Sequence, residues 1–128
     1  TEEALKATNT DGRTALIRAS AEGHEACLRV LLEAAEKAGV TEQALKATDS
    51  KGSTALICAS YYGHEACVRV LLEAAEKAGV TEEALKATNT DGRTALIQAS
   101  ANGHEACLRV LLEAAEKAGV TEEALKAT

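Results

Sequence analysis

The segment 25–38 has polar and apolar side chains spaced as on a helix with one narrow solvated face. Glu25, Arg29, Glu33 and Lys37 stand four residues apart and alternate in charge, and most residues between them are apolar. Such a stripe is typical of an exposed helix face supported by i,i+4 ion pairs. The wide apolar arc around the rest of the segment predicts a helix that is covered on several sides.

A shorter helix is expected just before this one, over residues 15–22. Thr14 is a suitable N-cap for it, and Gly23 is expected to end it. The stretch "NTDG" at residues 9–12 combines residue types that favour tight chain reversals. The pattern therefore predicts a turn followed by two antiparallel helices.

A third, short helix is expected after the long one. Gly39 ends the long helix, and Thr41 can cap a helix over residues 42–47, which has acidic residues at its positive end. This connector helix completes a structural unit that contains no strand.

The unit occurs three times. "TALI" begins at Thr14, Thr54 and Thr94, and "GHEAC" begins at Gly23, Gly63 and Gly103, so the period is 40 residues. The first eight residues, "TEEALKAT", recur as residues 121–128. We therefore expect an all-α helical solenoid that forms one domain. Its parts are an N-terminal partial repeat with a connector helix (1–10), a first repeat (11–50), a second repeat (51–90) and a third repeat (91–128).

The first and third repeats differ at only three positions over residues 11–48 and 91–128. Such close identity indicates either a recent duplication or a designed consensus sequence. We favour design, because the matching ends suggest a chain cut at a chosen register.

Residues 11–34, "DGRTALIRASAEGHEACLRVLLEA", resemble the ankyrin repeat, whose pattern is Gly-x-Thr-Pro-Leu-His-x-Ala-Ala-x-x-Gly-His followed by an apolar helix. The matching residues are Gly12, Thr14, Leu16, Ala19, Gly23, His24, Leu31 and Leu32, with their equivalents in the other repeats. Ala15 replaces the proline of the pattern, Ile17 replaces its first histidine, and the period is longer than the usual 33. An armadillo-like solenoid of three-helix units is the alternative, but the turn and Gly-His signals count against it.

The positions at which the repeats differ form a group. The main ones are 11/51/91, 13/53/93, 18/58/98, 21/61/101 and 22/62/102. The last three lie on one face of the first helix, and the first two flank the turn glycine. The resemblance implies that this turn and helix face form a target-binding surface. The candidate partner-binding residues are Asp11, Arg13, Arg18, Glu22, Lys51, Ser53, Cys58, Tyr61, Tyr62, Arg93, Gln98 and Asn102.

These positions favour a protein–protein interaction scaffold, a synthetic repeat protein that binds a protein or peptide target. Tyr61 and Tyr62 are the only aromatic residues, and tyrosine is common at binding hot spots. The alternatives are a purely structural or self-associating scaffold without a target and, more remotely, thiol chemistry at Cys58.

Composition and charge indicate which partners and sites are not expected. The net charge of −6 without a basic patch argues against nucleic acid and anionic membranes as partners. We expect no enzyme, cofactor or metal site, because a closed zinc site needs four converging ligands. Cys27, Cys67 and Cys107 are expected to be buried and reduced, while Cys58 is expected to be accessible to solvent. Reduced cysteines and the absence of a targeting signal favour cytoplasmic expression.

The ends of the solenoid are expected to be partly exposed, because the terminal repeats keep the apolar residues of internal ones. These residues are Leu16, Ile17 and Leu28 in the first repeat and Leu108, Val110, Leu111 and Leu112 in the third. The two end faces should be complementary, which predicts weak head-to-tail self-association. The two "TEEALKAT" copies would compete for one place at that junction.

Overall fold

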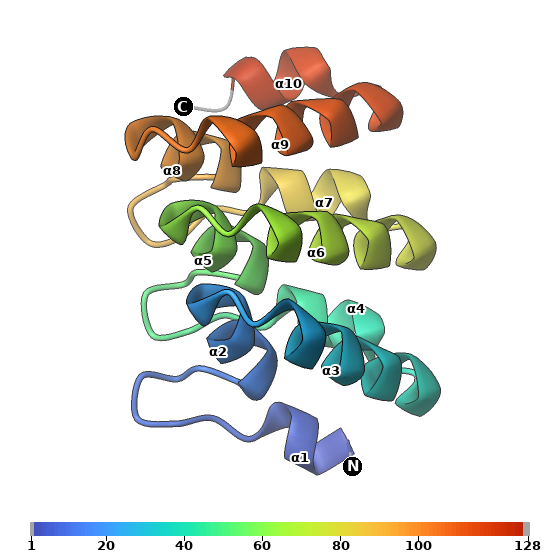
Figure 1. Ribbon diagram of the computed structural model, residues 1–128. Helices are drawn as coiled ribbons and strands as arrows, with labels where there is room; N and C mark the ends of the chain where they lie inside the picture. Colours follow the sequence, from blue (N-terminus) through green and yellow to red (C-terminus); the bar gives the residue numbers. More distant parts are fainter. Residues whose placement is uncertain (1, 127–128) are drawn as a thin grey trace.

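The computed structural model describes residues 2–126, in which helices are joined by turns and short loops and stack into a solenoid (Figure 1). One short helix, α1 (Glu2–Lys6), precedes three groups of three helices. The groups are α2 (Ala15–Glu22), α3 (Glu25–Ala38) and α4 (Thr41–Lys46); α5 (Ala55–Tyr62), α6 (Glu65–Ala78) and α7 (Thr81–Lys86); and α8 (Ala95–Ala101), α9 (Glu105–Ala118) and α10 (Thr121–Lys126). The expected all-α solenoid is confirmed.

The helix ends follow mostly from local sequence. The Thr14 hydroxyl accepts a hydrogen bond from the Ile17 N–H (3.1 Å), which caps α2 as expected. The prediction that Thr41 caps the connector is wrong, because Thr41 is the first residue of α4 and Val40 holds the N-cap position. Val40 is buried, and its N–H donates to the Ala35 carbonyl at the end of α3 (2.9 Å). Packing of an apolar residue therefore sets the start of α4.

Each turn before a first helix is closed by its leading side chain. The Asn9 side-chain oxygen accepts hydrogen bonds from the N–H groups of Asp11 (2.9 Å) and Arg13 (3.0 Å). Asp49 accepts the equivalent bonds in the second repeat, both at 2.9 Å. These bonds fix the backbone of the turn tips, as is usual for Asn and Asp in turns.

The core lies along the joints between repeats. Helices α2, α5 and α8 pack in one row, and α3, α6 and α9 pack in a second row beside it (Figure 1). The largest fully buried apolar side chains are Ile17, Leu28, Ile57, Val68, Leu71 and Leu111. Because these side chains meet across the joints, each repeat depends on its neighbours for much of its burial.

The expectation about the ends is only partly right. Leu16, Ile17 and Leu28 are buried, as are Val110 and Leu111. The first three are buried because α2 and α3 are covered by the second repeat, and the other two because α9 packs against α6, α7 and α10. Leu108 and Leu112 are half-buried, as is Ile97 of α8, and Val30 of α3 is exposed.

A histidine fastens the second repeat to the first and another fastens the third repeat to the second. The His64 Nε2–H donates to the Ala21 carbonyl at 3.0 Å, and His104 makes the equivalent bond to the Tyr61 carbonyl at 2.9 Å. Each of these two histidines reaches back across a joint. We call these contacts the inter-repeat histidine bonds. Each ring also lies so close to the glycine of the previous repeat that no side chain fits there.

Leucine-to-alanine changes at equivalent positions should report the coverage of each repeat. Leu71→Ala and Leu111→Ala should each lower the free energy of unfolding by about 2–5 kcal/mol, because both side chains are fully buried. Leu31→Ala should cost less, because Leu31 is only half-buried. Denaturant titration measures all three. A loss at Leu31 as large as that at Leu71 would contradict the open N-terminal face.

Two glycines provide a matched test of the histidine contact. Gly63 (φ +78°) and Gly79 (φ +73°) share the left-handed conformation, but only at Gly63 would an added Cβ meet the His104 ring, at 2.5 Å from Nδ1. Gly79→Ala should cost about 1–2 kcal/mol from backbone strain alone. Gly63→Ala should cost clearly more, because the His104 ring must move. Thermal unfolding of both variants checks this, and equal losses would show that the ring contact is unimportant.

Candidate protein-binding surface

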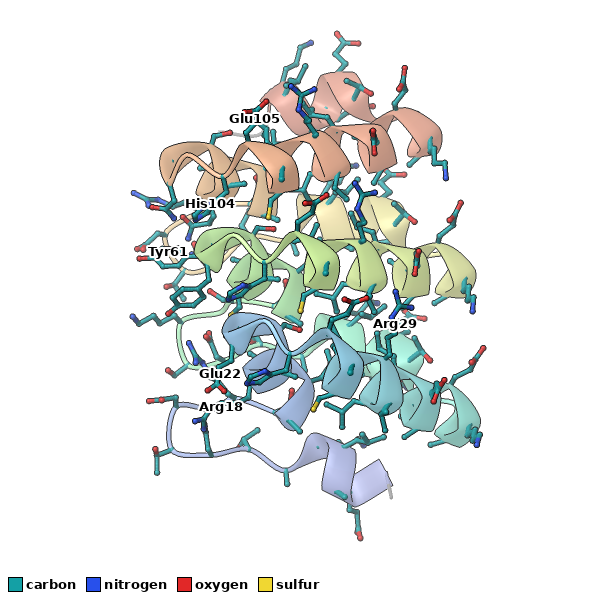
Figure 2. All side chains as sticks on the ribbon, in the orientation of Figure 1. Arg18, Glu22, Arg29, Tyr61, His104 and Glu105 are labelled. Carbon is teal, nitrogen blue, oxygen red and sulfur yellow. The ribbon has the colours of Figure 1, made fainter. Side chains whose placement is uncertain are left out.

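Nine of the candidate residues are accessible and form what we call the variable patch. They are Asp11, Arg13, Arg18, Glu22, Lys51, Tyr61, Tyr62, Arg93 and Asn102, of which Arg13 is half-buried and the others are exposed. Figure 2 shows Arg18, Glu22 and Tyr61 along the turn side of the stack, while Arg29 lies over the long helices. The fold therefore gathers side chains from all three repeats on one side.

The two tyrosines lie at the centre of the variable patch. Their rings meet edge to face, with centroids 4.8 Å apart and an interplanar angle of 78°. The Tyr62 ring also stacks on the His64 ring at 6.4 Å. Tyr61 is 43% exposed and Tyr62 48%, so much of each ring remains available for contact.

The backbone beneath the tyrosines is fixed by the third repeat. The Tyr61 carbonyl accepts hydrogen bonds from the His104 ring (2.9 Å) and from the Asn102 side-chain amide (3.2 Å). Sequence reasoning placed Asn102 in the binding surface but did not foresee this contact. The repeated Gly-His motif could have indicated the contact of His104 with the preceding repeat if the histidine had been assigned to a joint between repeats.

The variable patch also carries charged side chains. Arg18 donates to Glu22 in an exposed i,i+4 ion pair, and this hydrogen bond holds the pKa of Glu22 below its usual value. Burial lowers the pKa of Arg13, but a hydrogen bond with Tyr62 and nearby negative charge outweigh that effect and raise it overall. Lys51 and Arg93 add two more exposed cations. The variable patch thus carries four cations and two anions on a chain that is acidic as a whole.

The other three candidates, Ser53, Cys58 and Gln98, are buried. Cys58 is only 4% exposed, and its thiol lies 3.8 Å from the Asp49 carboxylate. The expectation that Cys58 is accessible is wrong. Asp49, in the turn that leads into the second repeat, lies beside Cys58, and Arg93, after the turn that leads into the third repeat, donates to Gln98 at 3.5 Å. In the first repeat no complete repeat precedes Arg18, which is exposed.

The environment of Cys58 does not support thiol chemistry. Burial, followed by the negative charge of Asp49, raises the pKa of this thiol to about 12. A nucleophilic cysteine needs the opposite shift, because the thiolate is the reactive form. Burial also raises the pKa values of Cys67 and Cys107, which lie inside the joints between repeats.

The prediction that Cys27 is buried is also wrong. It is exposed, whereas its equivalents Cys67 and Cys107 are fully buried. Their helix sequences are nearly the same, so the difference comes from the neighbour. This side of α6 and α9 faces the preceding repeat, while only α1 precedes the first repeat. All four cysteines are free thiols.

Metal sites and membrane-spanning helices were also considered for residues 2–126. No group of three or more His, Cys, Asp or Glu side chains is placed to hold a metal ion there. In the same range, the helices are too short or too polar to traverse a bilayer.

The repeat geometry and the comparisons with known proteins agree. A sequence model described as "Ankyrin repeats (3 copies)" matches residues 2–82 and again residues 38–123. The chain belongs to the ankyrin repeat family. Ankyrin repeats are generally protein–protein interaction modules, and proteins built from them are typically non-enzymatic binding scaffolds.

A solved structure shows the same fold. An ankyrin repeat domain from Acinetobacter baumannii AYE is 32% identical to this chain and superposes with a TM-score of 0.67. The match covers 86% of this ankyrin chain and 52% of the other, so the chain spans about half the length of that protein. No curated protein matches the chain.

Cysteine labelling in the native state should separate the four thiols. Brief treatment with iodoacetamide at neutral pH should modify Cys27 first, because Cys58, Cys67 and Cys107 are buried and their pKa values are raised. Cys58 should remain a neutral thiol until the pH approaches about 12. Peptide mass spectrometry identifies the labelled sites. Equal labelling in denaturant is the control, and native labelling of Cys58 as fast as Cys27 would contradict the burial.

Proposed function

We propose that the variable patch binds a protein or peptide partner, with Tyr61 and Tyr62 as its anchors. The observation that carries this proposal is the exposure of the only two aromatic residues side by side on the central repeat. Large rings contribute most to the core when they are buried, yet here the core consists of aliphatic side chains, alanine and cysteine. Tyrosine offers a large contact area at a small cost in side-chain entropy.

The rigidity of the variable patch supports the same proposal. The hydrogen bonds from His104 and Asn102 hold the Tyr61 backbone, and the Tyr62 ring rests against His64. A binding surface that is already ordered loses less entropy when a partner docks. The main differences between the repeats fall in and around this surface, as expected for a repeat scaffold with one diversified face.

The charges of the variable patch indicate the chemistry of the partner. Arg13, Lys51 and Arg93 come from three successive turns, and Arg13 is hydrogen-bonded to Tyr62. A partner that places an apolar or aromatic side chain between the tyrosines, with carboxylates around it, would be complementary. Such peripheral charge pairs mainly set orientation and association rate, and they weaken at high salt.

The test is affinity capture followed by a binding measurement. The immobilised full chain is used to capture proteins or displayed peptides, and affinities for the captured ligands are measured by calorimetry. Tyr61→Ala with Tyr62→Ala should weaken binding by about tenfold or more, as expected for loss of hot-spot side chains. Ligands that bind the wild type and the double variant equally would contradict the proposal.

Two controls make the result specific. Glu33→Ala with Glu73→Ala alters the exposed stripe of the long helices and should leave the affinity unchanged. Circular dichroism should show that the tyrosine variant keeps the helical fold, because both rings are half-exposed. A chain that captures no ligand under any of these conditions would favour the structural-scaffold alternative.

A further inference from the structure

A cavity lies at the joint between the first two repeats, on the side where the connector helices pack. Helices α4 and α7 lie below and above α6 in the view of Figure 1, and both pack against it. Together with α5 they border a volume of about 180 Å³, which we call the connector cavity. None of the candidate partner-binding residues lines it, so the proposed binding surface does not account for it.

The wall of the connector cavity is mostly aliphatic. Leu56, Leu71, Ala75 and Val80 line it, and each is 6% exposed or less. Leu45 adds a half-buried side chain from α4. Because these residues come from α4, α5, α6 and the position before α7, the packing of the joint fixes the shape of the cavity before any ligand enters.

The connector cavity offers few partners to water. Among the described residues whose buried side chains line it, Thr54 is the one polar residue. Its hydroxyl already accepts the hydrogen bond from the Ile57 N–H that caps α5 (3.2 Å). A buried water needs about two to four polar partners, and cavities lined by aliphatic side chains stay dry. An apolar occupant therefore fits this space better than water does.

Equivalent leucines show that the packing at this joint is incomplete. Leu45 of α4 and Leu85 of α7 hold the same position in their connectors, and each connector packs against the long helix of the following repeat. Leu85 is 6% exposed, whereas Leu45 is only half-buried. The joint between the second and third repeats covers its connector leucine, while the joint between the first and second leaves space beside Leu45.

Charged side chains at the mouth of the connector cavity restrict the ligand further. Lys46 and Glu83 line the cavity and are exposed. The Lys46 ammonium group binds Glu42 at 2.6 Å, and Glu83 adds a second negative charge near it. Two carboxylates therefore face one cation, and an anionic ligand would meet a net negative charge.

We propose that the connector cavity binds a small, uncharged apolar molecule of the size of benzene or toluene. An apolar cavity of about 150 Å³ lined by leucine, isoleucine and phenylalanine is large enough to bind benzene, and the connector cavity is slightly larger. The exposed side chains of Lys46 and Glu83 place its mouth at the surface, so that a ligand enters from solvent.

Such a ligand would hold two repeats together. It would contact α4 of the first repeat and α5 and α6 of the second. The cavity exists only when these repeats are packed, so the ligand binds the folded chain and stabilises it in proportion to its concentration and affinity. The ligand therefore strengthens the joint that the chain itself packs incompletely.

Two wider grooves differ from the connector cavity in their lining. They lie between α3 and α6 and between α6 and α9, and each has a volume of about 510 Å³. Glutamate, lysine and arginine side chains make up much of both linings. Charged groups at these grooves keep their hydration, because removing it without a partner is costly. The connector cavity is therefore the better place for an apolar ligand.

Methyl-selective NMR of the full chain titrated with toluene tests the proposal. Saturable shift changes should be largest for the methyl groups of Leu45, Leu56, Leu71 and Val80, which line the cavity. Thermal unfolding should give a midpoint that rises with toluene concentration. Benzoate carries a similar ring with a negative charge and should bind at least about tenfold more weakly.

Cavity-filling variants test the location of the ligand. Ala84→Leu in α7 and Leu45→Phe in α4 should each weaken toluene binding by about tenfold or more, because the added atoms occupy the cavity. Ala44→Leu makes the same change at the position of α4 equivalent to Ala84, which does not line the cavity, and should leave binding unchanged. Circular dichroism confirms the fold, and either filling variant suffices if the other does not fold.

Several results would overturn the proposal. They are the absence of saturable shifts up to the solubility of toluene, an affinity that the filling variants do not change, and benzoate binding as tight as that of toluene. Shifts concentrated on Leu32 or Val110 would instead place the ligand in the wider grooves. Tyr61→Ala with Tyr62→Ala should leave toluene binding intact, and a loss there would place the ligand on the variable patch.

Discussion

Packing of one repeat against the next is the interaction on which the rest of this structure depends. The chain has no phenylalanine or tryptophan, and fully buried leucines such as Leu28 and Leu71 lie where two repeats meet. A single repeat therefore cannot bury its apolar surface alone, as is general for solenoids. The inter-repeat histidine bonds and the backbone bonds between turn tips give the joint a fixed register. Apolar burial stabilises the joint, and these polar bonds restrict the packing of the two repeats to one arrangement.

The same joint determines which residues of the variable patch are accessible. One helix position carries Arg18, Cys58 and Gln98 in the three repeats, yet only Arg18 is exposed. The Tyr61 carbonyl is held by His104 of the following repeat. The binding surface is therefore a property of neighbouring repeats together, and altering a joint should alter the presentation of the tyrosines.

Local sequence was sufficient to predict the helices but not their surroundings. The bounds of α2 and α3, the Thr14 cap and the turn at Asn9 follow from spacing, capping and turn preferences, all of which act within a few residues. Spacing, capping and turn preferences could not predict the exposure of Cys27 or the burial of Cys58. Cys27 and Cys67 have nearly identical local sequences, so only the presence of a preceding repeat distinguishes them.

The repetition of the sequence also gives the two ends a direction. Each repeat has one face for its predecessor and another for its successor, and the two differ in residues such as Val30 and Ile97. A stack of such repeats has unlike ends, and each end fits a further copy of the repeat. Within the chain these unlike faces are buried against each other at the joints, as the burial of Val70 and Ile57 shows.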